Sequence, residues 1–67
     1  MAKIQLNGKK ITIKPKSSVL DILKRYKLDS RKLAIECNGF IIPRTNLKKT
    51  ILKENDKLEV VHFIGGG

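Results

Sequence analysis

The chain has 67 residues and a formal net charge of +9, from 15 Lys and Arg against six Asp and Glu. This length allows one domain with a small core and leaves little room for a deep catalytic cleft, which favours a carrier or binding module over an enzyme. A single cysteine, Cys37, and a single histidine, His62, exclude an internal disulfide and a Cys/His zinc site. No apolar stretch approaches the roughly 18 residues of a membrane span, so we expect a soluble, cytoplasmic protein. We also expect no cofactor.

The positive charge also suits a basic RNA-binding module, because basic surfaces attract phosphate. However, 12 of the 15 basic residues are Lys, and they are spread along the chain. The only aromatic residues are Tyr26, Phe40 and Phe63, too few to interleave with basic residues and stack on bases. The pattern therefore favours a solvated surface over a nucleic-acid site.

The first elements in the chain are predicted to be a β-hairpin and a helix. Residues 3–6 and 10–14 alternate on either side of Asn7-Gly8, a typical two-residue turn. Ser18, with Asp21 three residues later, resembles a capping box and places the start of the helix there. One side of this helix is apolar and should cover the sheet: Val19, Leu20, Ile22, Leu23 and Tyr26. We interpret Tyr26 as a core residue.

A third strand follows a polar connection over residues 28–32. Leu33, Ile35 and Cys37 alternate with Ala34 and Glu36, which predicts that the first three point inward. Cys37 is interpreted as a small core residue, because a redox-active thiol needs exposure and an electropositive neighbourhood.

A second hairpin and a long crossover are predicted next. Asn38-Gly39 is another turn signal, and it leads into a short strand over residues 40–42 that Pro43 stops. Residues 44–55 are mostly polar and predict an irregular crossover. Three apolar residues should attach it to the core: Leu47, Ile51 and Leu52.

Residues 57–64 form the predicted last strand, which Asn55-Asp56 should introduce by a turn. This strand carries apolar residues on both faces near its end, including Val61 and Phe63, so one face is available for a partner. His62 lies in the same strand without a nucleophile or carboxylate pair nearby, and we assign it no chemical role.

This order of elements predicts an α+β domain in which a mixed sheet of about five strands packs on one helix. If the first and last strands are neighbours, they must run parallel, because right-handed crossovers then close the sheet without a knot. This is the ubiquitin-like β-grasp arrangement. We expect the β-grasp domain over residues 1–64 and a flexible tail over residues 65–67.

The tail, Gly65-Gly66-Gly67, is the candidate working part of the chain. Three consecutive glycines at a given end should occur by chance in only ~3 of 10,000 chains. A linker remnant is the alternative explanation, since glycine is a common flexible filler. Without Cβ atoms, however, the tail can enter a channel too narrow for other residues, and it reaches roughly 10 Å when extended. It could thus place the Gly67 carboxylate in a partner's active site.

The sequence resembles the ThiS family of sulfur carriers over nearly its whole length. Residues 3–8 resemble the family's opening hairpin, and residues 35–44 (IECNGFIIPR) resemble its V-N-G-x-I-V-P-R stretch. Residues 55–59 (NDKLE) precede the glycines as the family's G-D-x-[VI]-E does. The chain departs from the pattern at Phe40, where the family often has a polar residue, at Asn55, which replaces a Gly, and in its basic charge.

This resemblance implies a mechanism in which the chain is a carrier and not an enzyme. A ThiF-like adenylating enzyme would activate the Gly67 carboxylate with ATP, and a sulfur donor protein would displace AMP to leave a thiocarboxylate. The sulfur would then pass to a ThiG-like thiazole synthase for thiamin biosynthesis. The free carrier is expected to be a monomer that docks through Phe40, Val61 and Phe63. Related carriers remain alternatives, namely a molybdopterin-synthase small subunit or a ubiquitin-like modifier.

Overall fold

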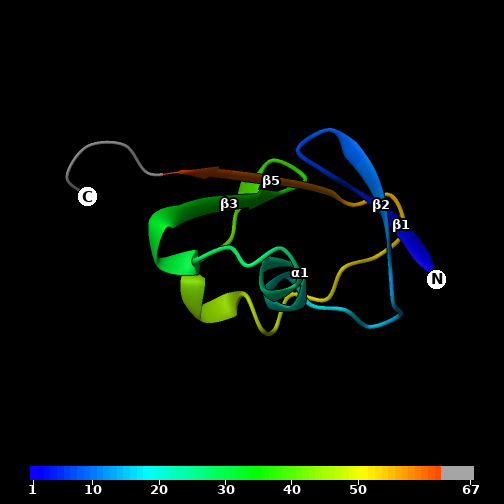
Figure 1. Cartoon of the computed structure of the whole chain (residues 1–67), viewed down its shortest axis with the longest axis horizontal. Coiled ribbons are helices and arrows are strands. Elements are labelled where there is room, and N and C mark those ends of the chain that lie inside the picture. Colours follow the sequence, from blue (N-terminus) through cyan, green and yellow to red (C-terminus); the bar gives the residue numbers. More distant parts are fainter. Residues whose placement is uncertain (63–67) are drawn as a thin grey trace.

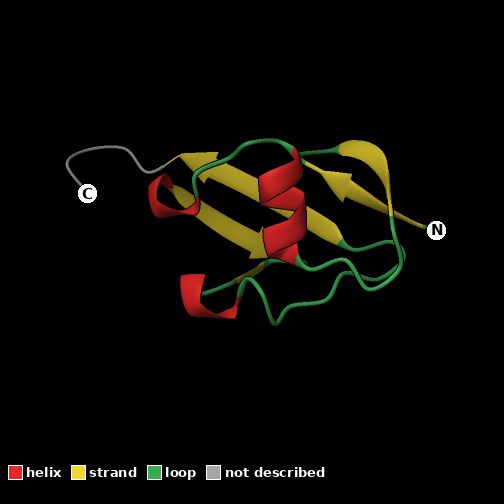
Figure 2. Ribbon diagram, turned by 60° about the horizontal axis from the view of Figure 1, so that its bottom comes forward, coloured by secondary structure: helices red, strands yellow, loops and turns green. Residues whose placement is uncertain are grey.

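Five strands and one α-helix make up the described part of the chain, residues 1–62 of a computed structural model. The strands form one sheet, and the helix crosses one of its faces (Figures 1 and 2). Two short 3-10 helices, η1 and η2, lie in the connections. In chain order the elements are β1 (Ala2–Leu6), β2 (Lys9–Ile13), α1 (Val19–Arg25), η1 (Ser30–Lys32), β3 (Leu33–Cys37), β4 (Phe40–Ile41), η2 (Arg44–Asn46) and β5 (Lys57–His62). The predicted α+β architecture is confirmed.

The last strand lies in the middle of the sheet, whose order is β2-β1-β5-β3-β4. β5 runs parallel to β1, with Gln5 opposite Lys57 and Leu6 opposite Leu58. Its other neighbour, β3, is antiparallel and pairs with it over five positions. The first and last strands are therefore neighbours, and the parallel direction predicted for that case is confirmed. β5 is held on both edges.

Both Asn-Gly turns have the backbone conformation that two-residue hairpins require. Asn7 and Gly8 have φ values of 50° and 81°, and Asn38 and Gly39 have 54° and 87°. Positive φ at both central residues gives a twist that matches the strands, and Asn and Gly adopt it most readily. The two predicted hairpins, β1-β2 and β3-β4, are confirmed.

Helix α1 begins where its capping residues place it. The Asp21 backbone N–H donates to Ser18 Oγ (3.1 Å), and the Ser18 N–H donates to Asp21 Oδ2 (2.9 Å). The first of these contacts satisfies one of the backbone donors that every helix leaves free at its start. The crossover satisfies others, since the Val19 and Leu20 N–H groups donate to the Thr50 and Leu47 carbonyls. The predicted helix start at Ser18 is confirmed.

The core lies between α1 and the sheet, with a floor contributed by the crossover. Its members are buried to 6% exposure or less: Ile4, Ile13, Val19, Ile22, Leu23, Leu33, Ile35, Leu47, Leu52 and Leu58. The predicted roles of Leu47 and Leu52 are confirmed. Ile51 between them is 46% exposed, so the prediction that it attaches the crossover to the core was wrong.

Tyr26 is not a core residue, contrary to the sequence interpretation. The helix ends at Arg25, and Tyr26 is its C-cap with 40% of its surface exposed. Its ring lies beside the Arg25 guanidinium, whose Cζ is 5.3 Å from the ring centroid. The apolar stripe was extended one turn too far, because a seven-residue helix ends before Tyr26 can turn towards the sheet.

Candidate functional site

The end of β5 carries the chain towards the predicted glycine tail. The last described pairings place Val61 opposite Ala34 and His62 opposite Leu33, both on β3. Phe63 and the tail, Gly65, Gly66 and Gly67, lie outside the described residues. The geometry of the site is therefore the geometry of β5 and of the surface around it.

Two asparagine side chains fix β5 in addition to its backbone pairing. Asn7 Oδ1 accepts a hydrogen bond from the Val60 N–H (2.7 Å), and Asn38 Oδ1 accepts one from the Lys57 N–H (2.9 Å). Asn38 also donates from Nδ2 to Asp56 Oδ1 (3.0 Å). The same asparagines that form the hairpin turns thus bind the strand from either side. Sequence analysis identified the turns but not these contacts.

The turn before β5 is also held by carboxylates. Asp56 Oδ2 accepts from the Lys53 N–H (2.8 Å), and Glu54 Oε1 accepts from the Lys3 N–H (3.0 Å). Asn55 has a φ of 71°, a conformation that glycine adopts more easily and asparagine tolerates. The predicted turn at Asn55-Asp56 is confirmed, and it sets the position at which β5 starts.

The face of the sheet opposite α1, which we call the open face, carries an apolar patch next to the end of β5. Val61 is 55% exposed and lies directly opposite Ala34. Ile41, on β4, is 72% exposed and lies opposite Glu36 on the same face. Exposed apolar side chains beside a strand end are typical of docking surfaces. We call Ala34, Ile41 and Val61 the apolar patch.

Phe40, which sequence analysis grouped with Val61, lies on the other face of the sheet, whereas Ile41, which it did not select, lies on the open face. Phe40 is 77% exposed but lies opposite Cys37, whose other cross-strand partner is the buried Leu58. Directly paired residues share a face, so Phe40 lies on the α1 side at the sheet edge, away from Val61. The uniform Phe40-Ile41-Ile42 run hides this difference, and only the pairing with Glu36 shows that Ile41 points to the open face.

Cys37 and His62 carry the only thiol and the only imidazole of the chain. Cys37 is half-buried and packs against the core, and burial, with a smaller effect of Asp56, raises the pKa of its thiol. His62 is exposed at the end of β5. Among residues 1–62 there is no group of three His, Cys, Asp or Glu side chains that could hold a metal ion. No helix in this part of the chain is long and apolar enough to cross a membrane.

Comparison with known proteins agrees with this geometry. The model of the ThiS family matches residues 4–67. The chain belongs to the ThiS family. A sulfur carrier protein ThiS from Bacillus subtilis is 35% identical over 65 residues, covering 96% of this chain and 98% of the relative. The crystal structure of a thiamine biosynthesis protein (ThiS) from Geobacter metallireducens superposes with a TM-score of 0.85 at 28% identity, covering 97% of this chain and 99% of that one.

ThiS-like sequence also occurs within a much larger protein. A thiazole synthase from Paramagnetospirillum magneticum is 37% identical over 65 residues. The match covers 97% of this chain but only 20% of the thiazole synthase, so this chain spans about a fifth of that relative. The remainder of that protein has no counterpart in this chain.

Proposed function

We propose that this member of the ThiS family, a sulfur carrier of thiamin biosynthesis, carries its sulfur on the carboxyl group of Gly67. The observation that supports the proposal is the position of β5. It is the central strand of the sheet, it is paired on both edges, and it leads along the sequence to Gly65-Gly66-Gly67. A strand that is paired on both edges fixes the point from which the chain continues to the glycine tail.

The chemistry requires an activation step, because a free carboxylate is a poor electrophile. A carboxylate oxygen of Gly67 would attack the α-phosphorus of ATP on an adenylating enzyme, releasing pyrophosphate and forming an acyl adenylate. Sulfide, or a sulfur donor protein that supplies it, would then attack the acyl carbon, and AMP would leave. The product is a thiocarboxylate, formed without net oxidation or reduction.

The final acceptor proposed for this sulfur is a thiazole synthase. The relative from P. magneticum supports this partner, because a segment similar to 97% of this chain is part of a protein named thiazole synthase. Covalent linkage of two modules raises their effective concentration and is useful when they act on one another.

Docking would use the apolar patch beside the end of β5. Val61 and Ile41 are exposed, and neither belongs to the buried core. Phe63 is proposed as a further contact from its position in the sequence, and Phe40 would lie outside this contact because it is on the other face. Small apolar areas of this kind suit complexes that form and dissociate within a reaction cycle.

Intact-mass measurement tests the proposal directly. The chain is incubated with ATP, sulfide and the ThiF-like adenylating enzyme of the same organism, and reactions without ATP or without enzyme serve as controls. Exchange of one carboxyl oxygen for sulfur raises the mass by about 16 Da. No mass increase with an adenylating enzyme that is shown to be active, by its release of pyrophosphate from ATP, would contradict the proposal. A chain that instead binds RNA with a steep salt dependence would favour the RNA-binding alternative.

A further inference from the structure

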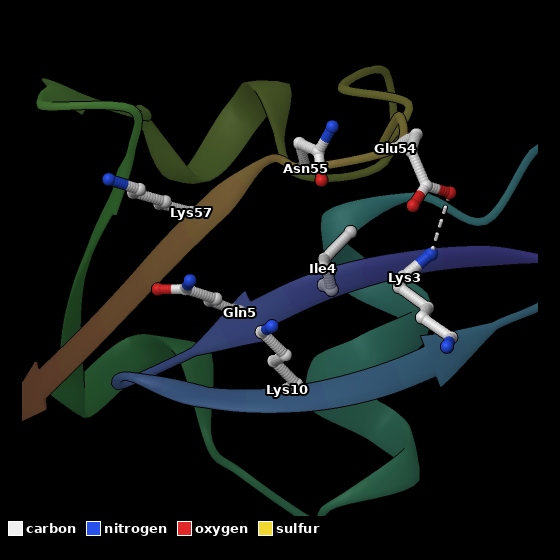
Figure 3. Close-up of a pocket in the computed structure, with 7 residues that line it drawn as sticks. All are labelled: Lys3, Ile4, Gln5, Lys10, Glu54, Asn55 and Lys57. Carbon is white, nitrogen blue, oxygen red and sulfur yellow. Dashed lines mark hydrogen bonds between the residues drawn. The ribbon is translucent and has the colours of Figure 1, made fainter.

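The open face carries three exposed lysines around Gln5, at the end of the sheet where β5 begins. The register places Lys10 on β2 and Lys57 on β5 on either side of Gln5, and Lys3 lies two residues earlier on β1. They line a hollow of ≈ 490 Å³, and Figure 3 shows them on three neighbouring strands. The nearby Glu54 carboxylate accepts the Lys3 backbone N–H. We call Lys3, Lys10 and Lys57 the lysine triad.

Two glutamates lie next to the lysine triad on the same face. Glu36 on β3 and Glu59 on β5 are directly opposite one another, and like charges in this arrangement destabilise a sheet. Within residues 1–62, neither has a hydrogen bond or an ion pair at its side chain. The other four acidic residues each accept a hydrogen bond that fixes a cap or a turn: Asp21, Asp29, Glu54 and Asp56. We call Glu36 and Glu59 the glutamate pair.

The charged and apolar groups of the open face are therefore arranged in sequence along the strands. Val61 follows Glu59 by two residues and Ala34 precedes Glu36 by two, so these two members of the apolar patch border the glutamate pair on the side away from the lysine triad. The third member, Ile41, lies beside Glu36 on β4. Positive charge, negative charge and apolar surface succeed one another towards the end of β5. Such a pattern matches a complementary surface in one orientation only, because a rotated partner would bring like charges together.

A protein is the occupant that this pattern favours. The glutamate pair would repel a phosphate backbone, and the strands of residues 1–62 place no aromatic side chain on the open face for bases to stack on. A second copy of the chain is disfavoured because each copy carries a net charge of +9. A partner protein can present carboxylates to the lysine triad and a basic side chain to the glutamate pair.

We propose that the lysine triad and the glutamate pair orient the carrier on its partner proteins, whose docking surfaces carry acidic groups opposite the triad and a basic group opposite the pair. This inference rests on the proposed function for the identity of the partners. The lysines set the rotation of the carrier about the apolar patch. The end of β5 then points towards the partner's active site in every productive encounter.

Charge reversal with a matched control tests the inference. Lys10→Glu/Lys57→Glu removes two lysines of the triad, and Lys48→Glu/Lys49→Glu makes the same change in net charge in the exposed crossover on the α1 side (Figure 1). The dissociation constants for the adenylating enzyme and the thiazole synthase of the same organism are measured at about 50 mM and about 200 mM salt. The triad variant should bind roughly tenfold more weakly at low salt, and the control within about twofold of the unmodified chain.

A second variant distinguishes the role of the glutamate pair in partner binding from its effect on folding. Glu36→Gln/Glu59→Gln removes the like-charge repulsion, so the melting temperature should stay the same or rise while partner binding weakens severalfold. Unchanged binding by this variant would overturn the role of the pair. Equal losses for the triad variant and the crossover control would overturn the role of the triad, since net charge alone would then explain the effect.

Two further measurements test whether a second copy of the chain or an RNA binds the open face instead. Sedimentation showing a dimer of the unmodified chain that charge reversal disperses would overturn the inference in favour of a second copy. Binding of a polyuridine oligonucleotide that only the triad variant loses would overturn it in favour of RNA. If the unmodified chain gains sulfur but triad reversal leaves the dissociation constants unchanged, the inference fails alone. If the unmodified chain binds both partners in a way that depends on the lysine triad but gains no sulfur, the proposed function fails alone.

Discussion

Asn7 forms with Val60 the pair of hydrogen bonds that a neighbouring strand would otherwise provide. Asn7 Oδ1 accepts from the Val60 N–H at 2.7 Å, and Asn7 Nδ2 donates to the Val60 carbonyl at 3.2 Å. β1 ends one residue earlier, at Leu6, so the side chain continues the pairing of β5 beyond the backbone of β1. One turn residue thereby joins the first hairpin to the strand that leads to the tail.

Replacing Asn7 should destabilise the fold through the loss of these two contacts. We expect Asn7→Gly to lower the free energy of unfolding by about 1–2 kcal/mol, because each hydrogen bond contributes roughly 0.5–1.5 kcal/mol. Glycine keeps the positive φ without strain, so this variant retains the turn and reports the lost side-chain contacts together with the larger entropy of glycine in the unfolded chain. Urea unfolding measures the effect, with Asn46→Ala as a control at an exposed asparagine of η2. Equal stability of Asn7→Gly and the unmodified chain would show that only the turn conformation matters.

Placing a charge in the apolar patch should weaken docking without weakening the fold. Val61 is 55% exposed, so Val61→Lys should change the free energy of unfolding by no more than about 0.5 kcal/mol. Binding to the adenylating enzyme or the thiazole synthase should weaken, because a desolvated ammonium would replace an apolar contact. Ile51→Lys provides the control, since Ile51 is also exposed but lies in the crossover. A large loss of stability in Val61→Lys would instead assign Val61 to the core.

The length of the tail should be as important as its composition. Deleting Gly67 withdraws the reactive carbon by about 3.5 Å, and adding one residue after Gly67 displaces it by a similar distance. Because a misplacement of ~1 Å can cost on the order of a hundredfold in rate, both variants should remain folded but gain little sulfur. Circular dichroism checks that both variants remain folded, and intact mass measures how much sulfur they gain. Equal conversion of all three chains would rule out Gly67 as the carrier residue.

Acid should destabilise the protein through its capping aspartates. The Arg31 guanidinium and backbone N–H hold the pKa of Asp29 at about 2, below the ordinary value of 3.8, and the Ser18 contacts lower the pKa of Asp21. Since the folded state then binds fewer protons, this contribution is present above pH 3.8 and is lost as the pH falls towards about 2. Asp21 is exposed and the Asp29 side chain is 39% exposed, so solvent screens both groups and the effect should be small.

Urea midpoints between about pH 5 and about pH 2 measure this dependence. Asp29→Asn removes one titrating group, so its midpoint should fall less steeply over the same range. The Arg31–Asp29 ion pair should also weaken with added salt. A midpoint that rises as the pH falls would contradict the assigned direction of the pKa shifts.

Most of the fold was predictable because its signals are local. Asn7-Gly8, Asn38-Gly39 and the Ser18 capping box each specify a backbone conformation within four residues, and the structure confirms all three. The parallel direction of β1 and β5 followed from handedness on the condition that the two strands are neighbours. Errors arose where a residue's environment depends on distant parts of the chain, as for Tyr26 and Ile51.

The candidate site was less predictable for the same reason. The contact of Asn7 with Val60 joins residues 53 positions apart, and no local pattern indicates it. The open face is defined by register, which separates Phe40 from Val61 and adds Ile41. The opposition of Glu36 to Glu59 likewise becomes visible only when β3 and β5 are aligned. The sequence shows which residue types are present, and strand pairing determines which of their side chains lie next to one another on the same face.

The parallel arrangement of β1 and β5 determines where a label or a solid support can be attached to the protein. Because the two strands run in the same direction, Ala2 lies at the end of the sheet where β5 begins, and His62 lies at the other end (Figure 1). A fluorophore, an affinity tag or a sensor chip joined ahead of Ala2 is therefore separated from the end of β5 by the length of the sheet. Amino-terminal immobilisation should leave the carboxyl-terminal side free for enzymes added in solution.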